Sequence, residues 1–363
     1  MWDTIRKMEY RAQAKLPGAA EALQARLADR MELPLQGLSG EKLYLTGVTQ
    51  LREKAAELDL MYQALPEHRG VKDTILLDAW SSATIEGART TVAQVRKSFD
   101  DPKTKDDRMV VNAIAGSNYA YGRPITAKNI RRLWERVVSG VCENEGCKGK
   151  LYRDGMVYIG HNGTTIHYPA VPEKIPSLME QLFVFQEQST DFLLSSFVAH
   201  FYFVYVHPFC DGNGRTARIL NASYLYHRGY RKIKNLPLSS AINNQLSGYY
   251  SSLQDSEASI LRDEESWLDL SPFVSYMLDA FERCLIDAAL AKNKLTDSET
   301  RVLERMNRVG RNAEITVAKA SQILKRSESA TRNVLNSLVS KGYLSVNTSQ
   351  TPFVYRLQQH ITN

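Results

Sequence analysis

One apolar run constrains the fold of this chain more than any other stretch. Residues 192–206 read FLLSSFVAHFYFVYV and are apolar on nearly every side, which is typical of a helix buried at the centre of a helical domain. Pro208 ends the run, and Asp-Gly-Asn-Gly at 211–214 predicts a tight turn. Helical spacing resumes over 215–228, so the polar sequence HPFCDGNGRTAR at 207–218 is predicted to be a loop between two helices.

The region up to about Lys294 is predicted to be mostly α-helical, because apolar residues recur at three-to-four spacing. An exception is VYIGHNGTTIHYPA at 157–170, where Asn162-Gly163 stands between two short β-prone runs. This dipeptide predicts a two-residue hairpin turn. A plain connector between helices is the alternative interpretation of the same segment.

The pattern after Lys294 predicts a winged helix-turn-helix. Three helical segments precede the sequence YLSVNTSQTPFVYRL, which is typical of a small β-wing. The helices are predicted over 298–309, 317–324 and 327–341. We therefore predict three regions: an N-terminal helical region at 1–108, a core at 109–293 and the winged helix-turn-helix at 294–363.

Composition and charge indicate an ordinary globular protein with a basic tail. The start lacks the apolar core of a secretory signal and no apolar span reaches about 20 residues, so we expect a cytoplasmic protein with no membrane partner. Residues 295–363 hold ten Lys and Arg against five Asp and Glu, which is +5 of the net +6. Such a tail indicates a separate module with an acidic partner such as nucleic acid.

The four cysteines show no zinc spacing and are expected to be reduced thiols: Cys142, Cys147, Cys210 and Cys284.

The 207–218 loop has the composition of an anion site. The first N–H groups of the helix that it opens lack intrahelical partners, and the helix dipole adds about half a positive charge there. Gly212 and Gly214 let a ligand approach the backbone, and Asn213 adds side-chain donors. Arg215 and Arg218 lie three residues apart and can reach one anion together. Two arginines and an amide nest favour a polyphosphate over a carboxylate.

Two further side chains of the loop suit phosphate chemistry. Asp211 fits a Mg²⁺ ion, which is usually held by one or two carboxylates together with substrate phosphates. His207 is the side chain in this loop that titrates near neutral pH, and is therefore the candidate base. A structural histidine at a helix end is the alternative for His207 alone.

Other phosphate motifs fit this chain less well. GNGRTA satisfies the pattern G-x-G-x-x-A, but that dinucleotide fingerprint follows a strand, whereas a helix precedes it here. The sequence G-x-x-x-x-G-K-[ST] of a P-loop is absent from the chain.

HPFCDGNGRTAR resembles the signature HPFx(D/E)GNGRxxR of Fic-domain proteins at every fixed position. The resemblance extends over roughly 109–288 and implies an α-helical core that transfers AMP from ATP to a Ser, Thr or Tyr hydroxyl of a protein. It implies that His207 deprotonates the hydroxyl and that Asp211 binds Mg²⁺. The remaining residues would bind the phosphates: Gly212, Asn213 and Gly214 the α- and β-phosphates, Arg215 the β/γ end, and Arg218 the γ-phosphate.

The resemblance also implies a docking flap and a base pocket. The hairpin at 157–168 corresponds to the Fic flap, which pairs with the target backbone as an added strand. Its expected docking residues are Val157, Tyr158, Ile159, Thr165, Ile166 and His167. Tyr249 and Tyr250 correspond to the adenine pocket. Several family members carry an asparagine eight residues beyond the first tyrosine, where this chain has Glu257, so the base preference stays open.

A second motif is similar to the inhibitory motif (S/T)xxxE(G/N) of the family. It is Ser82-x-x-x-Glu86-Gly87, on a helix predicted near 74–87. Ser82 and Glu86 would share one helix face and Gly87 would end the helix. The resemblance implies that Glu86 pairs with Arg218 and keeps the γ-phosphate from its productive position. A surface glutamate after a helix is the alternative.

These features favour a self-inhibited protein adenylyltransferase that uses ATP and Mg²⁺. The same site could instead remove AMP from a modified protein, with Glu86 positioning water. From another class, the chain could be a DNA-binding regulator whose Fic core senses nucleotide. The expected partners are a target protein, the chain itself as a substrate or homodimer, and DNA or protein at the winged helix. There the third helix would expose Ser329, Arg332, Asn333 and Asn336.

Overall fold

A computed structural model describes residues 2–65, 72–142, 147, 149–161, 164–258, 260–262, 265–293, 296–309, 313–341, 343–347 and 352–357. The chain divides into two compact units, Met1–Leu285 and Ile286–Asn363. The division falls inside the long helix α13 (Ser271–Asn293), whereas the sequence placed it after residue 293. Residues 1–108 pack into the first unit, and their separation from a catalytic core stays a prediction. No helix within the described ranges is long and apolar enough to cross a membrane.

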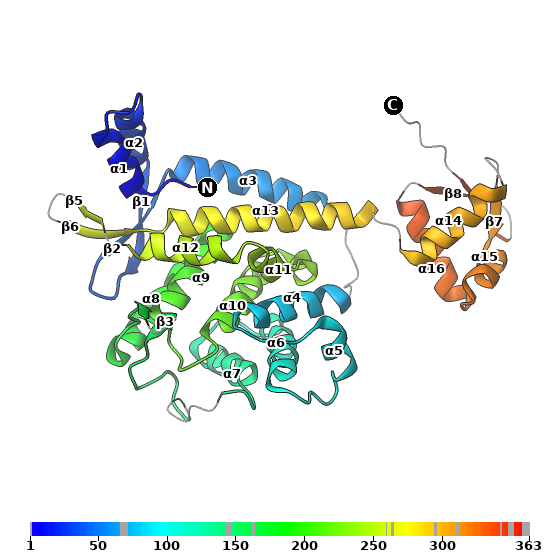
Figure 1. Cartoon of the computed structure of the whole chain (residues 1–363), viewed down its shortest axis with the longest axis horizontal. Helices are drawn as coiled ribbons and strands as arrows, with labels where there is room; N and C mark the ends of the chain where they lie inside the picture. Colours follow the sequence, from blue (N-terminus) through cyan, green and yellow to red (C-terminus); the bar gives the residue numbers. More distant parts are fainter. Residues whose placement is uncertain are drawn as a thin grey trace. The chain divides into compact units, whose positions relative to one another are not determined.

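The first unit is built around α9, as its apolar sequence predicts. Nearly every residue of α9 (Phe192–Val206) is buried. It packs between α8 (Ile175–Gln188) and α10 (Asn213–His227), and α10 also contacts α6 (Lys105–Tyr121) and α7 (Ala127–Val137) (Figure 1). The prediction of a mostly α-helical fold is confirmed.

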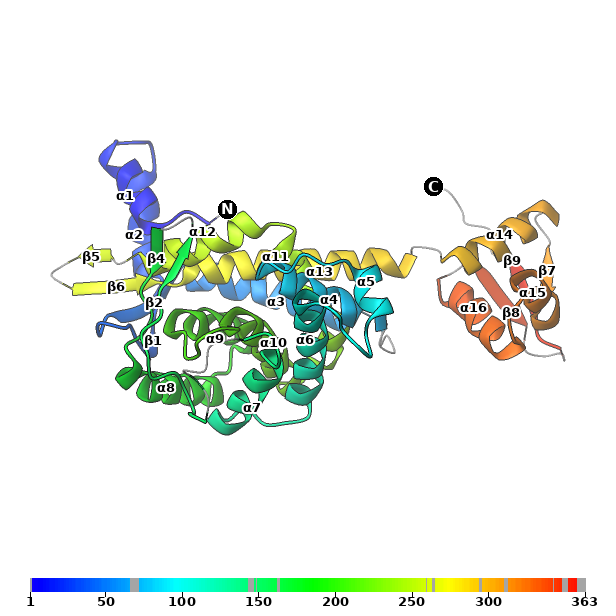
Figure 2. The ribbon, with the colours of Figure 1, turned by 60° about the horizontal axis from the view of Figure 1, so that its bottom comes forward.

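Helices α3 (Val48–Ala64) and α13 lie side by side along this core (Figures 1 and 2). Lys54 and Glu282 form an ion pair of 2.6 Å between them, and Tyr62 stacks on Phe281. Helix α4 (Lys72–Ile85) packs on α6, on α10 and on α11 (Leu238–Asn243). Shorter helical elements complete the unit: α5 (Val92–Lys97), α12 (Leu246–Glu257), η2 (Pro172–Lys174) and η3 (Arg231–Asn235).

A four-stranded sheet, which the sequence pattern did not predict, lies at one end of this unit. Its order is β1-β2-β6-β5, with β2 parallel to β6 and the other pairs antiparallel. Helices α1 (Ile5–Gln13) and α2 (Ala19–Ala28) cover it through Ile5 and Leu23, which pack near Trp267. The strands are β1 (Arg30–Gln36), β2 (Lys42–Thr46), β5 (Ile260–Arg262) and β6 (Glu265–Asp269).

The predicted hairpin at 157–170 is present. Strands β3 (Ile159–His161) and β4 (Thr164–His167) pair antiparallel, with Ile159 opposite His167. The turn residues Asn162 and Gly163 lie outside the described residues. In Figure 2 the hairpin stands near α12, which it contacts through His167 and Glu257.

The second unit has the order of elements of a winged helix-turn-helix. Helix α15 is followed by a short turn and then α16, whose Leu335 and Leu338 are buried in the core of the unit. Strand β7 joins the wing strands in the order β7-β9-β8 and was not predicted. The elements are α14 (Asp297–Val309), β7 (Glu314–Thr316), α15 (Val317–Leu324), α16 (Glu328–Ser340), β8 (Leu344–Asn347) and β9 (Val354–Leu357).

Candidate active site

The 207–218 segment forms the predicted loop between two helices. Helix α9 ends at Val206, and α10 begins at Asn213 after Gly212, whose φ of 74° is left-handed. His207 also adopts a left-handed φ of 53°, a conformation that costs a non-glycine residue about 1–2 kcal/mol. His207 and the first amides of α10 therefore lie at the two ends of the same short loop.

Neighbouring segments hold this loop firmly. Arg153 is buried and donates from its backbone N to Pro208 O (3.0 Å) and from Nε to His207 O (2.8 Å). Trp134 donates from Nε1 to Asp211 O (2.6 Å) and stacks on Phe209. Neither Arg153 nor Trp134 was singled out from the sequence, because their contacts join segments more than 50 residues apart.

The Asn213 side chain does not offer donors to an anion, contrary to the expectation. It is buried, and Asn213 Nδ2 donates to Phe209 O (2.8 Å) while its Oδ1 accepts from Phe209 N (3.0 Å). The side chain therefore closes the loop on itself. The backbone N–H groups at the start of α10 carry the anion-binding character instead.

His207 is arranged as a base. Its Nδ1 lies 3.2 Å from Val204 O, a carbonyl that only accepts, so Nδ1 carries the hydrogen. The lone pair is then on Nε2. Burial lowers the pKa of His207 to about 4, against a smaller opposing effect of Glu86. The ring is therefore neutral at physiological pH and can accept a proton.

Arg215 and Asp211 lie together at the start of α10. The Arg215 side chain is buried, with Nη1 3.3 Å from Val137 O and Nη2 3.5 Å from Asp211 Oδ1. Its Nε has no hydrogen-bond partner among the described residues. Asp211 accepts from Gly212 N through Oδ1, and its side chain is 47% exposed. A buried guanidinium with this little compensation favours an anionic ligand beside it.

Arg218 is bound to the end of α4. Its Nη2 forms a 2.7 Å ion pair with Glu86 Oε1, Nε donates to Ser82 Oγ (2.9 Å), and Nη2 donates to Ser82 O (3.0 Å). Burial opposes ionisation of Glu86, but the positive charge of Arg218 outweighs it, and the pKa of Glu86 lies below its ordinary value. Glu86 and Arg218 therefore both carry charge.

Glu86 also lies at the start of α10. A Cβ at position 214 would collide with Glu86 Oε1, so Gly214 is required where the carboxylate approaches the backbone. Gly87 has a φ of 89° and follows the end of α4 at Ile85. An acidic side chain thus occupies space beside the helix N-terminus where the sequence predicts a phosphate.

Tyr249 and Tyr250 lie near this ion pair. Tyr249 is buried, with its hydroxyl 3.1 Å from His200 Nε2. The Tyr250 hydroxyl donates to Ile85 O at 3.2 Å, a contact with the last residue of α4. Tyr250, a predicted residue of the base pocket, therefore also contacts α4, the helix that carries the predicted inhibitory motif.

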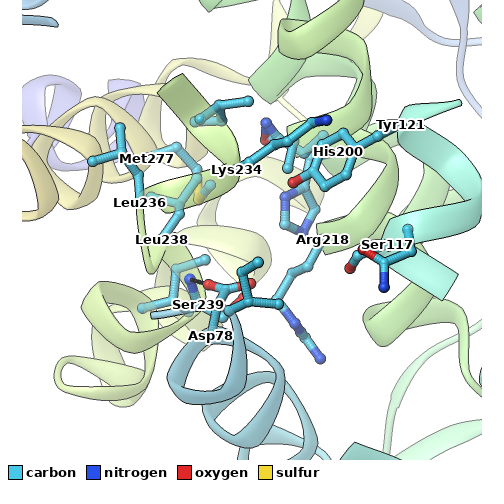
Figure 3. Close-up of a pocket in the computed structure, with 16 residues that line it drawn as sticks. Asp78, Ser117, Tyr121, His200, Arg218, Lys234, Leu236, Leu238, Ser239 and Met277 are labelled. Carbon is cyan, nitrogen blue, oxygen red and sulfur yellow. Dashed lines mark hydrogen bonds between the residues drawn. The ribbon is translucent and has the colours of Figure 1, made fainter. Parts of the chain in front are cut away.

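A small cavity lies between α4 and α10, with Asp78 and Arg218 among the residues that line it (Figure 3). It has a volume of about 50 Å³, enough for a few water molecules. Asp78 of α4 faces it and accepts from Ser239 N at 2.7 Å. Burial raises the pKa of Asp78 to about 6. Within the described part of the chain, His200 Nδ1 and the Asn221 amide, which also line the cavity, have no hydrogen-bond partner.

The contacts of the flap, residues 157–168, with the rest of the unit lie near its C-terminal end. His167 contacts Glu257 and Tyr205, while Tyr158 and Tyr168 are exposed and their ring centroids lie 6.0 Å apart. Ile159 starts β3, and Val157 lies two residues before this strand. The side chains of Thr165 and Ile166 lie outside the described residues, so their expected docking role stays a prediction.

The expectation of four reduced thiols is wrong for two of them. Cys210, inside the loop, forms a disulfide with Cys147, with 6.3 Å between the Cα atoms. Cys142 and Cys284 are not part of a disulfide. The spacing of 63 residues carries no sequence signal for this pair, which the fold of the segment after α7 brings together.

Comparison with known proteins shows which family this chain is similar to. Residues 124–225 match the family model described as Fic/DOC family. This stretch is similar to a Fic domain. It is 29% identical over 254 residues to the protein adenylyltransferase Fic of Drosophila mojavensis, which covers 66% of this chain and 46% of the relative. The identity to the protein of that name from Drosophila melanogaster is 29% over 232 residues, 60% of this chain and 42% of the relative. The chain thus spans less than half the length of these curated relatives.

Solved structures support the same fold. A Fic family protein from Desulfovibrio desulfuricans G20 aligns with a TM-score of 0.57 at 22% identity, over 86% of this chain and 96% of that one. Residues 134–508 of Fic-1 from C. elegans align with a TM-score of 0.55 at 19% identity, over 79% and 83%. The Fic fold of the catalytic region is therefore shared with these proteins.

Proposed function

We propose that the chain is a protein adenylyltransferase that transfers AMP from ATP to a Ser, Thr or Tyr hydroxyl and is inhibited by its own Glu86. The observation that carries the proposal is the loop itself. A neutral histidine with its lone pair on Nε2, a helix N-terminus and the poorly compensated Arg215 all belong to this loop and the helix that it opens. The name of the relatives, protein adenylyltransferase, supports the same activity.

In this proposal the loop divides the chemistry among its residues. The target hydroxyl oxygen attacks the α-phosphorus of ATP as its proton passes to His207 Nε2. The bond between the α-phosphorus and the oxygen that bridges to the β-phosphate breaks, and pyrophosphate leaves. The first amides of α10 and the Arg215 guanidinium stabilise the charge that develops on the phosphate oxygens.

The residues also fit a Mg²⁺ ion bound together with the nucleotide. Asp211 offers one partly exposed carboxylate at the loop. Within the described ranges no cluster of three or more His, Cys, Asp and Glu side chains could hold a metal. One carboxylate is the donor set expected where phosphates and water supply the other ligands. A bound Mg²⁺ would neutralise phosphate charge.

The flap would present the hydroxyl. As an exposed hairpin it can pair with an extended segment of the target through backbone hydrogen bonds. Self-modification needs a hydroxyl of the same chain or a second copy. Homodimer formation and the cytoplasmic location remain predictions from the sequence.

A direct test incubates the purified wild-type chain and Glu86→Gly with Mg²⁺ and ATP labelled on the α-phosphate. We expect Glu86→Gly to gain covalently bound adenylate on a hydroxyl, located by peptide mass spectrometry. The double variant Glu86→Gly, His207→Ala is the control and should gain none. Label that both variants acquire equally, or label lost on denaturation, would refute the transfer activity.

Removal of AMP from a modified protein is the second candidate for the same site. It is favoured by the position of Glu86 beside both Gly214 and Arg218, where a carboxylate could orient a water molecule. An adenylylated protein made with Glu86→Gly provides the substrate. Release of AMP by the wild-type chain, but not by Glu86→Gly, would assign this reaction.

The second unit suits DNA binding. Helix α16 exposes Ser329, Arg332, Asn333 and Asn336, a polar face of the kind that reads base edges. The measurement is the affinity of residues 294–363 for duplex DNA at two salt concentrations. Affinity that falls steeply with salt supports phosphate contacts, and weak, salt-independent binding assigns the unit to a protein partner.

A further inference from the structure

One side chain ties the flap to two helices of the candidate site. His167 is the last residue of β4, and its side chain is 10% exposed. Its Nδ1 lies 2.9 Å from Glu257 Oε2, at the end of α12, and its Nε2 lies 2.8 Å from Tyr205 O in α9. The imidazole therefore joins the base of the flap to both helices.

Both partners of this ring accept hydrogen bonds and donate none. A carboxylate and a backbone carbonyl each require an N–H from the imidazole. The neutral ring has one N–H and can satisfy one partner, whereas the doubly protonated ring satisfies both. Bonds between charged groups are roughly twice as strong as neutral ones. The ring of the flap pair, His167 and Glu257, therefore donates to both of its partners only when both ring nitrogens carry hydrogen.

The contacts of His167 with Tyr205 and Glu257 connect the flap to the helix before the proposed base and to the helix of the predicted base pocket. Tyr205 precedes His207 by two residues, so the contact to Tyr205 O relates the flap to the proposed base. Helix α12 also carries Tyr249 and Tyr250, so the contact to Glu257 relates the flap to the predicted base pocket. Since the Glu257 carboxylate contacts the flap, it is not free to read the nucleotide base in this arrangement.

We propose that His167 is a positioning residue. Together with Glu257 it holds the flap where a target hydroxyl bound to the flap lies within reach of His207 and the α-phosphate. The inference rests on the proposed function for its chemistry, but the flap contact itself does not. A displacement of about 1 Å can cost up to a hundredfold in rate, so we expect a roughly tenfold loss of transfer to hydroxyls when the flap pair is broken. Transfer of AMP to water needs no flap and should be unaffected.

The experiment uses the full chain with Glu86→Gly, to which His167→Ala, His167→Gln or Gln254→Ala is added. Gln254 is exposed on α12 and serves as the matched control. Three quantities are measured: the affinity for ATP by calorimetry, the ratio of protein adenylylation to AMP released into water, and hydrogen exchange of the β4 amides without nucleotide. We expect His167→Ala to lower the ratio about tenfold and to speed β4 exchange, at unchanged ATP affinity.

The conservative variant separates positioning from folding. The single amide group of glutamine can reach one of the two partners, so His167→Gln should lie between the parent and His167→Ala in both exchange and ratio. Equal ratios for His167→Ala and Gln254→Ala, or ATP affinity that falls together with the ratio, would overturn the positioning role. If the Glu86→Gly parent transfers no AMP at all, the proposed function fails, and faster β4 exchange in His167→Ala alone still upholds the flap contact.

Discussion

Replacing Glu86 with glycine tests the inhibited state most directly. In the wild-type chain, the Arg218 guanidinium donates to Glu86 Oε1, Ser82 Oγ and Ser82 O at 2.7 to 3.0 Å. Glycine removes the carboxylate and leaves both bonds to Ser82. It also clears the space beside Gly214 that Glu86 Oε1 occupies. Arg218 and the start of α10 then become accessible to the γ-phosphate.

The size of the effect can be worked from these contacts. A hydrogen bond to a charged group contributes roughly 1.5–3 kcal/mol. If ATP no longer competes with Glu86 for Arg218, this free energy becomes available to the transition state, which corresponds to about 10- to 150-fold in rate. Because the two bonds to Ser82 still restrain the guanidinium, we expect the lower end, a gain of about tenfold in adenylate transfer.

The assay is the initial rate of self-adenylylation in Mg²⁺ and ATP, with ATP affinity measured separately by calorimetry. Glu86→Gln is the matched control, since it keeps the size of the side chain but not its charge, and should give an intermediate rate. The double variant Glu86→Gly, Arg218→Ala should lose the gain. A Glu86→Gly chain no faster than wild type, or a double variant that keeps the gain, would refute inhibition through Arg218.

Three other residues of the unit, His207, Arg215 and Asp78, give four further tests. His207→Ala should abolish transfer while ATP affinity stays within about twofold, and equal loss of binding and turnover would argue against a base. Because burial lowers the pKa of His207 to about 4, the rate of Glu86→Gly should be flat from pH 6 to 8 and fall as the pH approaches 4, which a pH–rate profile checks. Arg215→Ala should weaken ATP binding by at least about tenfold in calorimetry, the loss of a charged hydrogen bond, and unchanged affinity would remove it from the site. Asp78→Asn should raise the free energy of unfolding at pH 7.5. Burial raises the folded-state pKa of Asp78 from 3.8 to about 6, so the wild-type chain keeps its full stability below pH 4 and loses part of it as the pH rises through 6. The loss amounts to up to about 3 kcal/mol. Urea midpoints of both chains at pH 4 and 7.5 measure it, and an equal difference at the two pH values would contradict the assignment.

The helices and the loop between them could be predicted because their signals are local. The apolar run of α9, the glycines at 212 and 214 and the spacing of α10 all lie within about 40 residues of sequence. The three helices of the second unit have the same character, and their predicted bounds differ from α14, α15 and α16 by one residue or less.

The four-stranded sheet was missed for a physical reason. In β1, Leu33 and Leu35 are buried between exposed neighbours, a period of two, but the run is short and contains Pro34, which lowers any strand prediction. Its neighbour β2 pairs with β6 across more than 200 residues of sequence. Pairing of that range leaves no pattern in either segment alone.

The composition of the candidate site and its Glu86–Arg218 pair were predictable, but several of its other contacts were not. The motif indicated which residues gather at the loop, and the structure brings Glu86, Ser82 and Arg218 together. The sequence did not indicate that Asn213 bonds its own loop, that Tyr250 contacts α4, or that Cys210 is oxidised. Each of these depends on how the helices pack.

The attachment of α4 indicates how inhibition would be relieved. Three sets of contacts hold this helix: Asp78 to Ser239 N along its length, Ser82 and Glu86 to Arg218, and Ile85 O to the Tyr250 hydroxyl. Its apolar face is also buried against α6, α10 and α11. Competition by a γ-phosphate for Arg218 disturbs the Glu86 contact and leaves the Asp78 and Tyr250 contacts intact. Undocking the whole helix would instead require the loss of all of them together with its buried surface, which costs far more than one ion pair. If Glu86 inhibits the chain as proposed, its relief would therefore be a rearrangement of the Glu86 and Arg218 side chains on a helix that stays in place.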